Sequence, residues 1–101
     1  MKVFISQPMR GLSEAKIITV RERIFGDFQA KYPDAELIDN FVPTSEERLA
    51  VKHAEVQLLG RSVCRLADAD IVIMAKGWEN HPGCRIEHKI ATYYDIPVKY
   101  A

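Results

Sequence analysis

Residues 71–87 read IVIMAKGWENHPGCRIE, and this stretch decides how the rest of the chain is interpreted. Its apolar start, at 71–75, is typical of a buried strand, and a polar loop follows. Helical spacing of apolar residues then begins with Ile86 and Ile90. Open α/β sheets bind their ligands in the loops that follow the strands. Glu87, close to the start of this helix, is therefore the first candidate for a functional residue.

Three other runs of β-forming residues, at 2–6, 35–39 and 96–100, alternate with helical patterns. The element order is then βαβαβαβ, and right-handed crossovers favour a parallel sheet with helices on both faces. We predict an α/β fold with a small doubly wound, flavodoxin-like parallel sheet, about four strands in the order 2-1-3-4 and three helices. A chain of 101 residues has room for a single domain, at residues 1–101.

The first two helices have sequence signals for their starts. Ser13 is a plausible N-cap for a helix that should end near Pro33. Its apolar stripe is Ile17, Val20, Ile24 and Phe28. The sequence TSEE at 44–47 is a capping box and predicts the start of a long second helix. The residues that we expect this second helix to bury are Val56, Leu59, Val63 and Leu66. Gly60 interrupts it, which suggests a close approach of another segment.

The composition argues against several classes of partner. Lys plus Arg and Asp plus Glu both number 14, so the chain lacks the positive field that attracts nucleic acid polymers or acidic membrane surfaces. No apolar run approaches the ~18 residues of a membrane span, and no signal peptide is recognisable, so we expect a cytoplasmic protein. Cys64 and Cys84 have neither CxxC spacing nor a disulfide-rich setting, and we expect both to be reduced thiols.

In the predicted strand order, strands one and three are neighbours, and the loops after them face one crevice. The first loop begins with Ser6 and Gln7, which can form hydrogen bonds. Arg10 could bind an anion, and Gly11 would allow the backbone to approach a ligand closely. Met9 could help to shape a pocket for a base. Alternatively, the loop only turns the chain and Arg10 pairs with a surface carboxylate, since neither a Walker motif nor GxGxxG is present.

The second loop leads from Gly77 and Trp78 to a helix that begins near Gly83. A base or sugar ring could stack on Trp78, although a single tryptophan often only caps a core. Glu87 lies near the helix N-terminus, whose partial positive charge favours an ionised carboxylate. Such a carboxylate could attack an anomeric carbon, as in retaining glycoside chemistry. The alternative is a surface glutamate that pairs with Arg85, Lys89 or Arg10.

Two histidines lie on either side of this glutamate in the sequence. His81 and His88 could donate protons, although histidines on polar helix faces are often only solvated. A zinc site would require His81, Cys84 and His88 to converge, and only Cys84 and His88 have the one-turn spacing of paired helical ligands. We therefore expect no metal and no cofactor.

Several segments resemble one family of small bacterial and phage domains without an assigned activity. They are VFISQPMRG at 3–11, LLGRS at 58–62, ADAD at 67–70, KGWE at 76–79 and GCRIEH at 83–88. That family is similar to the nucleoside 2-deoxyribosyltransferase superfamily, which includes the deoxynucleoside monophosphate N-glycosidases. The resemblance to the small-domain family spans nearly the whole chain. The resemblance to the characterised enzymes rests on the order of elements, the first loop and Glu87.

The resemblance implies a doubly wound sheet, a nucleoside or nucleotide in its crevice and a nucleophilic glutamate at the position of Glu87. It also implies that Arg10 and Gly11 hold a phosphate. Three positions depart from the characterised enzymes. Their first-strand tyrosine is Phe4 here, their helix aspartate falls near Ser62, and their second helper group falls near His81.

Three functions are compatible with these residues. The leading hypothesis is nucleoside or nucleotide binding with N-glycosidic cleavage or deoxyribosyl transfer, in which Glu87 is the nucleophile and His81 the candidate acid. Substrate binding is then assigned to Ser6, Gln7, Met9, Arg10, Gly11, Ser62, Gly77, Trp78 and Gly83. The alternatives are a non-catalytic nucleotide or sugar-phosphate binding module, and a structural or interaction protein of phage or mobile-element origin. Under all three we expect a homodimer or higher homo-oligomer, formed through Tyr93, Tyr94 or the second helix.

Overall fold

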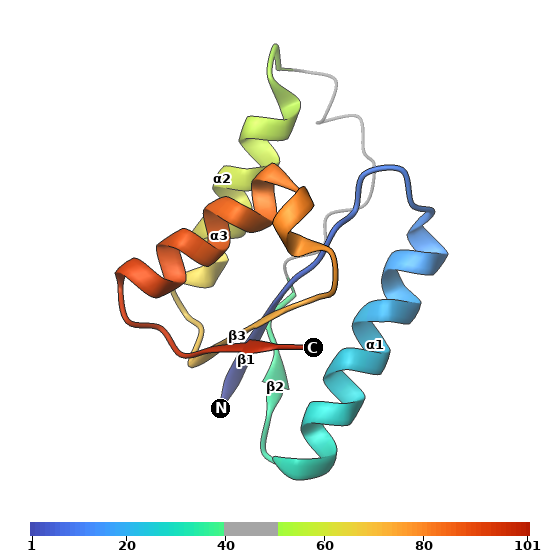
Figure 1. The fold of residues 1–101 in the computed structure, drawn as a ribbon, viewed down its shortest axis with the longest axis vertical. Coiled ribbons are helices and arrows are strands. Elements are labelled where there is room, and N and C mark those ends of the chain that lie inside the picture. The colour runs from blue at the N-terminus through green and yellow to red at the C-terminus, as the bar shows by residue number, and fades with distance from the viewer. Residues whose placement is uncertain (40–50) are drawn as a thin grey trace.

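The computed structural model describes residues 1–39 and 51–101, and Figure 1 shows its α/β architecture. Four strands form one parallel sheet in the order β2-β1-β3-β4, and three helices pack on it, as predicted. In chain order the elements are β1 (Lys2–Ser6), α1 (Glu14–Lys31), β2 (Glu36–Leu37), α2 (Ala54–Leu66), β3 (Ile71–Met74), the 3-10 helix η2 (Trp78–Asn80), α3 (Pro82–Tyr93) and β4 (Val98–Tyr100).

The central strands β1 and β3 are buried along most of their length and lie side by side. Ser6, the last residue of β1, pairs in register with Met74. Asp70 fixes the start of this pairing, because its carboxylate accepts a hydrogen bond from the Lys2 backbone N–H at 2.6 Å and its own N–H donates to the Lys2 carbonyl at 2.8 Å. The loops after both strands therefore open at the same edge of the sheet.

Alternate residues along each strand build a core on each face of the sheet. α1 covers one face, and α2 and α3 cover the other (Figure 1). The core on the α1 face consists of Val3, Ile5, Ile24, Phe28, Ala35, Ile73 and Ala75. The core under α2 and α3 consists of Phe4, Leu66, Val72, Met74, Cys84 and Ala91. Because Ser6 lies two residues after Phe4, the alternation directs its side chain toward α2 and α3.

α1 begins and ends close to the predicted positions. The Ser13 hydroxyl oxygen accepts a hydrogen bond from the Lys16 backbone N–H at 3.2 Å, as an N-cap does. The helix ends at Lys31, before Pro33. Of the predicted stripe, Ile17, Ile24 and Phe28 are buried and Val20 is half-buried. Arg21 lies on the same face and is only 6% exposed, which the apolar pattern did not indicate.

The prediction that α2 buries its whole apolar stripe is wrong. Leu66 is fully buried, whereas Val56 is 68% exposed and the residues between them are at most half-buried. The turn at 51–53 precedes the helix, which begins at Ala54, and the predicted capping box at 44–47 lies outside the described residues. Outside its own helix backbone, no heavy atom of residues 1–39 or 51–101 lies within 4 Å of a Cβ built on Gly60, so no described segment approaches this glycine closely.

The apolar spacing of α3 is confirmed at Ile90, which is half-buried and packs against the core, and is wrong at Ile86. Cys84, Glu87 and Ala91 are its buried residues, while Ile86 is 43% exposed and Tyr93 is 77% exposed. Cys84 and Ala91 lie one turn before and one turn after Glu87, and their small side chains let the helix lie close to β1 and β3. This rotation of the helix places the Glu87 carboxylate in the interior.

The edge strands are shorter than predicted, at 36–37 and 98–100. Pro97 lies just outside β4, and its carbonyl accepts a hydrogen bond from the Val72 N–H at 2.9 Å. Both cysteines are free thiols, as predicted, with Cys64 exposed and Cys84 buried. No helix in the described parts of the chain has the length and apolarity that crossing a membrane requires.

Candidate functional site

A pocket opens at the sheet edge where β1 and β3 end. Its volume is about 400 Å³, within the range of pockets that bind small molecules. The loop after β1, one side of α2 and the first turns of α3 form its walls. The predicted site residues that line it are Gln7, Met9, Arg10, Ser62, His81, Gly83 and Glu87. Segments that are far apart in the sequence therefore meet here.

Glu87 forms the floor of this pocket, where two serines hold its carboxylate. Ser6 at the end of β1 donates a hydrogen bond from Oγ to Glu87 Oε1 at 2.6 Å. Ser62 of α2 donates from Oγ to Oε2 at 2.5 Å. Glu87 is only 6% exposed, so it is not the surface glutamate of the alternative interpretation. Three different elements thus fix the orientation of one carboxylate.

Burial changes the acidity of this group. Removal from water raises the pKa of Glu87 above the ordinary value for glutamate, and the hydrogen bonds from Ser6 and Ser62 oppose the rise because they favour the ionised form. The expectation that the start of α3 would favour ionisation is therefore incomplete, since desolvation is the larger effect. The hydrogen bonds from the two serines offset part of the free-energy cost of burying this carboxylate.

Cys84 lies beside this carboxylate in the wall of the pocket. Burial raises the pKa of the Cys84 thiol, and the charge of Glu87 raises it further, while a hydrogen bond with Ser6 opposes both effects. A thiol with a raised pKa stays protonated at neutral pH and is a poor nucleophile. Cys84 therefore contributes shape and weak polarity to the pocket, and Glu87 remains its nucleophile candidate.

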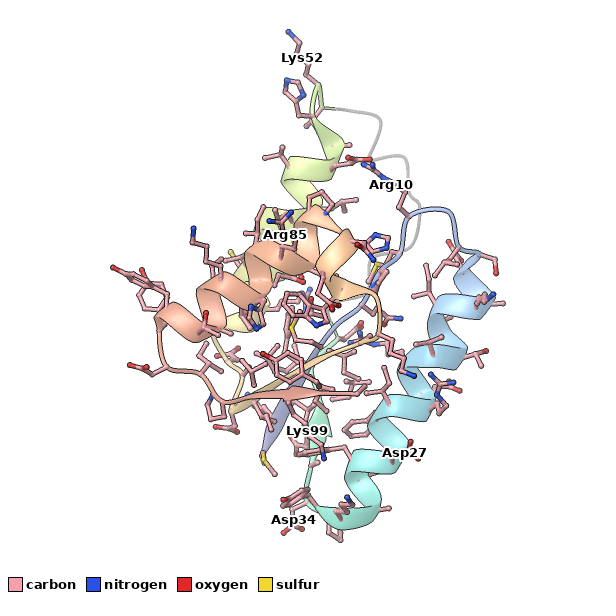
Figure 2. All side chains as sticks on the ribbon, viewed as in Figure 1. Arg10, Asp27, Asp34, Lys52, Arg85 and Lys99 are labelled. Carbon is pink, nitrogen blue, oxygen red and sulfur yellow. The ribbon has the colours of Figure 1, made fainter. Side chains whose placement is uncertain are left out.

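The mouth of the pocket holds an ion pair. Arg10 of the first loop donates from Nη2 to Glu55 Oε2 at 2.8 Å, and Glu55 lies in the first turn of α2. Figure 2 shows Arg10 reaching from the loop toward α2. Both side chains are largely exposed, at 72% and 68%. This is the alternative weighed for Arg10, pairing with a surface carboxylate, and it occurs at the entrance of the pocket.

Gly11 has a conformational role in the first loop. It has a φ of 79°, and the Leu12 N–H donates to the Met9 carbonyl at 3.2 Å, so the loop turns with the left-handed conformation that glycine adopts readily. A Cβ at Gly11 would meet no atom of the described residues beyond its chain neighbours within 4 Å, and Gly11 does not line the pocket. The turn orients Arg10 and does not itself approach the ligand space.

A buried arginine supports the same loop. Arg21 donates from Nη2 to the Ile38 carbonyl at 2.6 Å and from Nη1 to Gln7 Oε1 at 3.4 Å. The Gln7 amide in turn donates to the Ile17 carbonyl at 3.1 Å. Burial lowers the pKa of Arg21, and the charge of Asp39 opposes this. Gln7 is therefore a fixed wall of the pocket, tied to α1.

Trp78 and Gly77 lie apart from the Glu87 pocket. Trp78 stacks on His88 with ring centroids 4.2 Å apart, and His88 Nε2 lies 2.7 Å from the Tyr100 hydroxyl. Gly77 has a φ of 85°, which turns the chain into η2. These residues do not line the pocket around Glu87, so the predicted stacking of a base on Trp78 has no support there.

The larger cavity of the molecule lies on the opposite face of the sheet, beside α1. It measures about 840 Å³ and shares Gln7 and Pro8 with the Glu87 pocket. Apolar residues of α1 and β3 form much of its wall, and the titratable groups at its rim, such as Lys99 and Asp27, are exposed (Figure 2). Since it holds no buried reactive group, the smaller pocket is the candidate site.

Sequence patterns did not indicate three residues of this region. Glu55, Arg21 and Ile86 were not among the candidates, although each has a recognisable position. Arg21 lies on the apolar stripe between Ile17 and Ile24, where its charge is buried and therefore needs hydrogen-bond partners.

In residues 1–39 and 51–101, no three His, Cys, Asp or Glu side chains are grouped closely enough to hold a metal ion.

Comparison with known families gives one result. The model of a domain of unknown function, DUF4406, matches residues 1–100. The chain belongs to the DUF4406 family. No curated protein and no solved structure matches it significantly. Because the description of DUF4406 assigns no activity, the function of this DUF4406 chain has to be argued from its pocket.

Proposed function

We propose that the pocket binds a nucleoside or nucleotide and that Glu87 cleaves or transfers its N-glycosidic bond as a nucleophile. The observation that carries this proposal is the buried Glu87 carboxylate, held by Ser6 and Ser62 at the floor of a ligand-sized pocket. A carboxylate fixed in one orientation at such a place is suited to attack an electrophilic carbon.

The chemistry would proceed in two steps. One Glu87 oxygen attacks C1′ of the sugar, the bond between C1′ and the base nitrogen breaks, and an ester to Glu87 forms. The departing base takes up a proton, for which His81, in the wall of the same pocket, is the candidate donor. Water, or the nitrogen of a second base, then attacks C1′, loses its proton and releases Glu87. The first acceptor gives hydrolysis and the second gives transfer.

The two serines and the walls have separate tasks in this mechanism. Ser6 and Ser62 orient the carboxylate and keep enough ionised form for attack despite burial. An ionised carboxylate has about four lone-pair sites, so both hydrogen bonds leave electron pairs for the carbon. The apolar side chains of Met9, Leu59 and Ile86 in the walls exclude water from the reacting atoms.

A second function is favoured by the raised pKa of Glu87. The protonated acid can donate a hydrogen bond to a ligand and cannot act as a nucleophile. A pocket in which this form dominates would bind a nucleoside, a nucleotide or a sugar phosphate without turnover. Phe4 is consistent with this alternative, because the ring is fully buried and supplies no hydroxyl to the site.

The variant Glu87→Gln distinguishes the two functions. Purified protein is incubated with 2′-deoxynucleosides and their 5′-monophosphates, and free base is separated by chromatography. Catalysis predicts base release by the natural protein and a loss of at least about 10³-fold in Glu87→Gln. Glu79→Gln is the matched control, since Glu79 is exposed and lies outside the pocket.

Three other outcomes of this experiment would decide between catalysis, binding alone and neither function. Base release that persists in Glu87→Gln removes Glu87 from the mechanism. Thermal stabilisation by a ligand without base release supports the binding module. If none of these compounds is cleaved or stabilises the protein, the pocket is not a nucleoside or nucleotide site.

A further inference from the structure

The Arg10–Glu55 pair gives the mouth of the pocket a feature that the proposed function does not explain. Arg10 is the one arginine or lysine among the described residues that line the pocket, and it already pairs with Glu55 at 2.8 Å. We propose that Glu55 makes the site select uncharged nucleosides over their 5′-phosphates. This deepens the proposed function and rests on it.

The charges around the pocket support this selectivity. A phosphate monoester carries about −1.5 to −2 charges at neutral pH. To reach the other N–H groups of Arg10, a phosphate would have to lie beside the Glu55 carboxylate, which is a like charge. Glu87 adds a further acidic group at the floor. Among the described residues that line the pocket, a dianion therefore meets two carboxyl side chains and one guanidinium.

The N-terminus of α3 does not reverse this balance. His81, the N-cap residue, makes no side-chain capping bond, and the first residues of α3 line the pocket. The combined effect of the N–H groups at the start of α3 is about half an elementary charge. Glu87, in the second turn of the same helix, lies close to this partial charge. Among the described lining residues, Arg10 therefore has a carboxylate partner, and Glu87 follows one turn after the start of α3.

An uncharged hydroxyl fits the Arg10–Glu55 pair without breaking it. A sugar hydroxyl can donate to the Glu55 carboxylate and accept from the Arg10 guanidinium at once. The neighbouring wall, with Val56 and Ile86, is apolar and partly exposed, which suits the unsubstituted sugar and base better than a phosphate. The expected ligand is therefore a 2′-deoxynucleoside without a 5′-phosphate.

The test compares deoxynucleosides with their 5′-monophosphates on the natural protein, Glu55→Gln and the control Glu79→Gln. Dissociation constants are measured by calorimetry at about pH 8, where histidine is uncharged, and kcat/KM is used where turnover occurs. The natural protein should prefer the nucleoside. Glu55→Gln should bind the monophosphate about tenfold more tightly, because one carboxylate charge near the phosphate is removed. Its affinity for the nucleoside should not rise, because the amide that replaces the Glu55 carboxylate is a weaker acceptor for the sugar hydroxyl.

The gain in monophosphate affinity that we expect for Glu55→Gln should also depend on Arg10 and on the salt concentration. In the double variant Glu55→Gln with Arg10→Gln it should disappear, and added salt should reduce it because both side chains are exposed. Tighter binding of the monophosphate by the natural protein, or an unchanged ratio in Glu55→Gln, would overturn the selectivity while the role of Glu87 stands. Failure of all proteins to bind either compound would instead refute the nucleoside site itself, and this inference with it.

Discussion

Glu87 at the floor of the pocket and Glu55 at its mouth are the same type of residue on neighbouring helices, yet their surroundings differ. Glu87 is 6% exposed and accepts hydrogen bonds from two neutral hydroxyls. The Glu55 side chain is 68% exposed and pairs with a full positive charge on Arg10. The pKa of Glu87 is raised by desolvation. The environment of a carboxylate, more than the charge of its partner, thus decides what it contributes.

The two carboxylates should contribute differently to the stability of the fold. An exposed ion pair is screened by water and contributes about 0–1 kcal/mol. A hydrogen bond to a buried charge contributes about 1.5–3 kcal/mol, because its loss leaves the charge unsatisfied. The neutral serines at the floor should therefore matter more to stability than the arginine at the mouth. The predictions below test this order.

The largest effect is expected for Ser6→Ala. Removing the donor to Glu87 Oε1 should lower the free energy of unfolding by about 1.5–3 kcal/mol at about pH 7. The loss should shrink toward about pH 4, since a protonated Glu87 needs the donor less. Urea unfolding at both pH values measures this. Ser13→Ala is the control, because Ser13 caps a backbone N–H and its loss should not depend on pH. Equal losses at both pH values would contradict the interpretation.

For Glu87→Gln we expect a smaller change in stability, and of opposite sign. Because the folded pKa of Glu87 is raised, the folded protein holds this proton more tightly than the unfolded chain does. Its stability contribution is most favourable below the ordinary glutamate pKa of about 4.3 and declines as the pH rises through the raised pKa. A glutamine side chain does not ionise, so the variant does not lose stability in this way as the pH rises. Thermal unfolding should show a more stable variant at about pH 7 and little difference at about pH 4. A variant that is less stable at both would show that the carboxylate itself is needed for packing.

The mouth pair should contribute least to stability. A double-mutant cycle of Arg10→Ala and Glu55→Ala should give a coupling energy below about 1 kcal/mol, and salt should decrease it further. A coupling as large as that of Ser6 with Glu87 would erase the distinction between floor and mouth.

No change in ligand binding is expected for Trp78→Phe. Trp78 stacks on His88 and lies outside the pocket, so the affinity for a pocket ligand should stay within about twofold. Met9→Ala, in the pocket wall, should weaken binding of the same ligand. A large loss in Trp78→Phe would mean that the ligand extends beyond the Glu87 pocket.

The fold could be predicted from the sequence because its signals are local. The apolar run before Lys76, the Ser13 cap and the alternation of strands and helices each depend on neighbouring residues, and handedness rules then leave few sheet orders. The meeting of the first loop with Glu87 follows from that order. The edge strands were predicted too long, since their ends depend on partners in the sheet.

The details of the site were less accessible from the sequence. Helical spacing indicated Ile86 and Ile90, and only Ile90 packs against the core. Close packing against the sheet favours the small Cys84 and Ala91 and so turns Glu87 inward. The choice of Glu55 as the partner of Arg10 depends on where α2 begins in space. Trp78, beside Gly77 in the sequence, turns away to His88 and Tyr100.

The sequence by itself determined the order of strands and helices, the absence of a strong net charge and the candidacy of Glu87, because periodicity, caps and composition are properties of neighbouring residues. Only the tertiary structure decided that Ser6 and Ser62 hold Glu87, that Glu55 occupies Arg10 and that Trp78 lies elsewhere. Those contacts join residues distant in the sequence, and they depend on helix rotation and packing distance, which the sequence pattern does not specify.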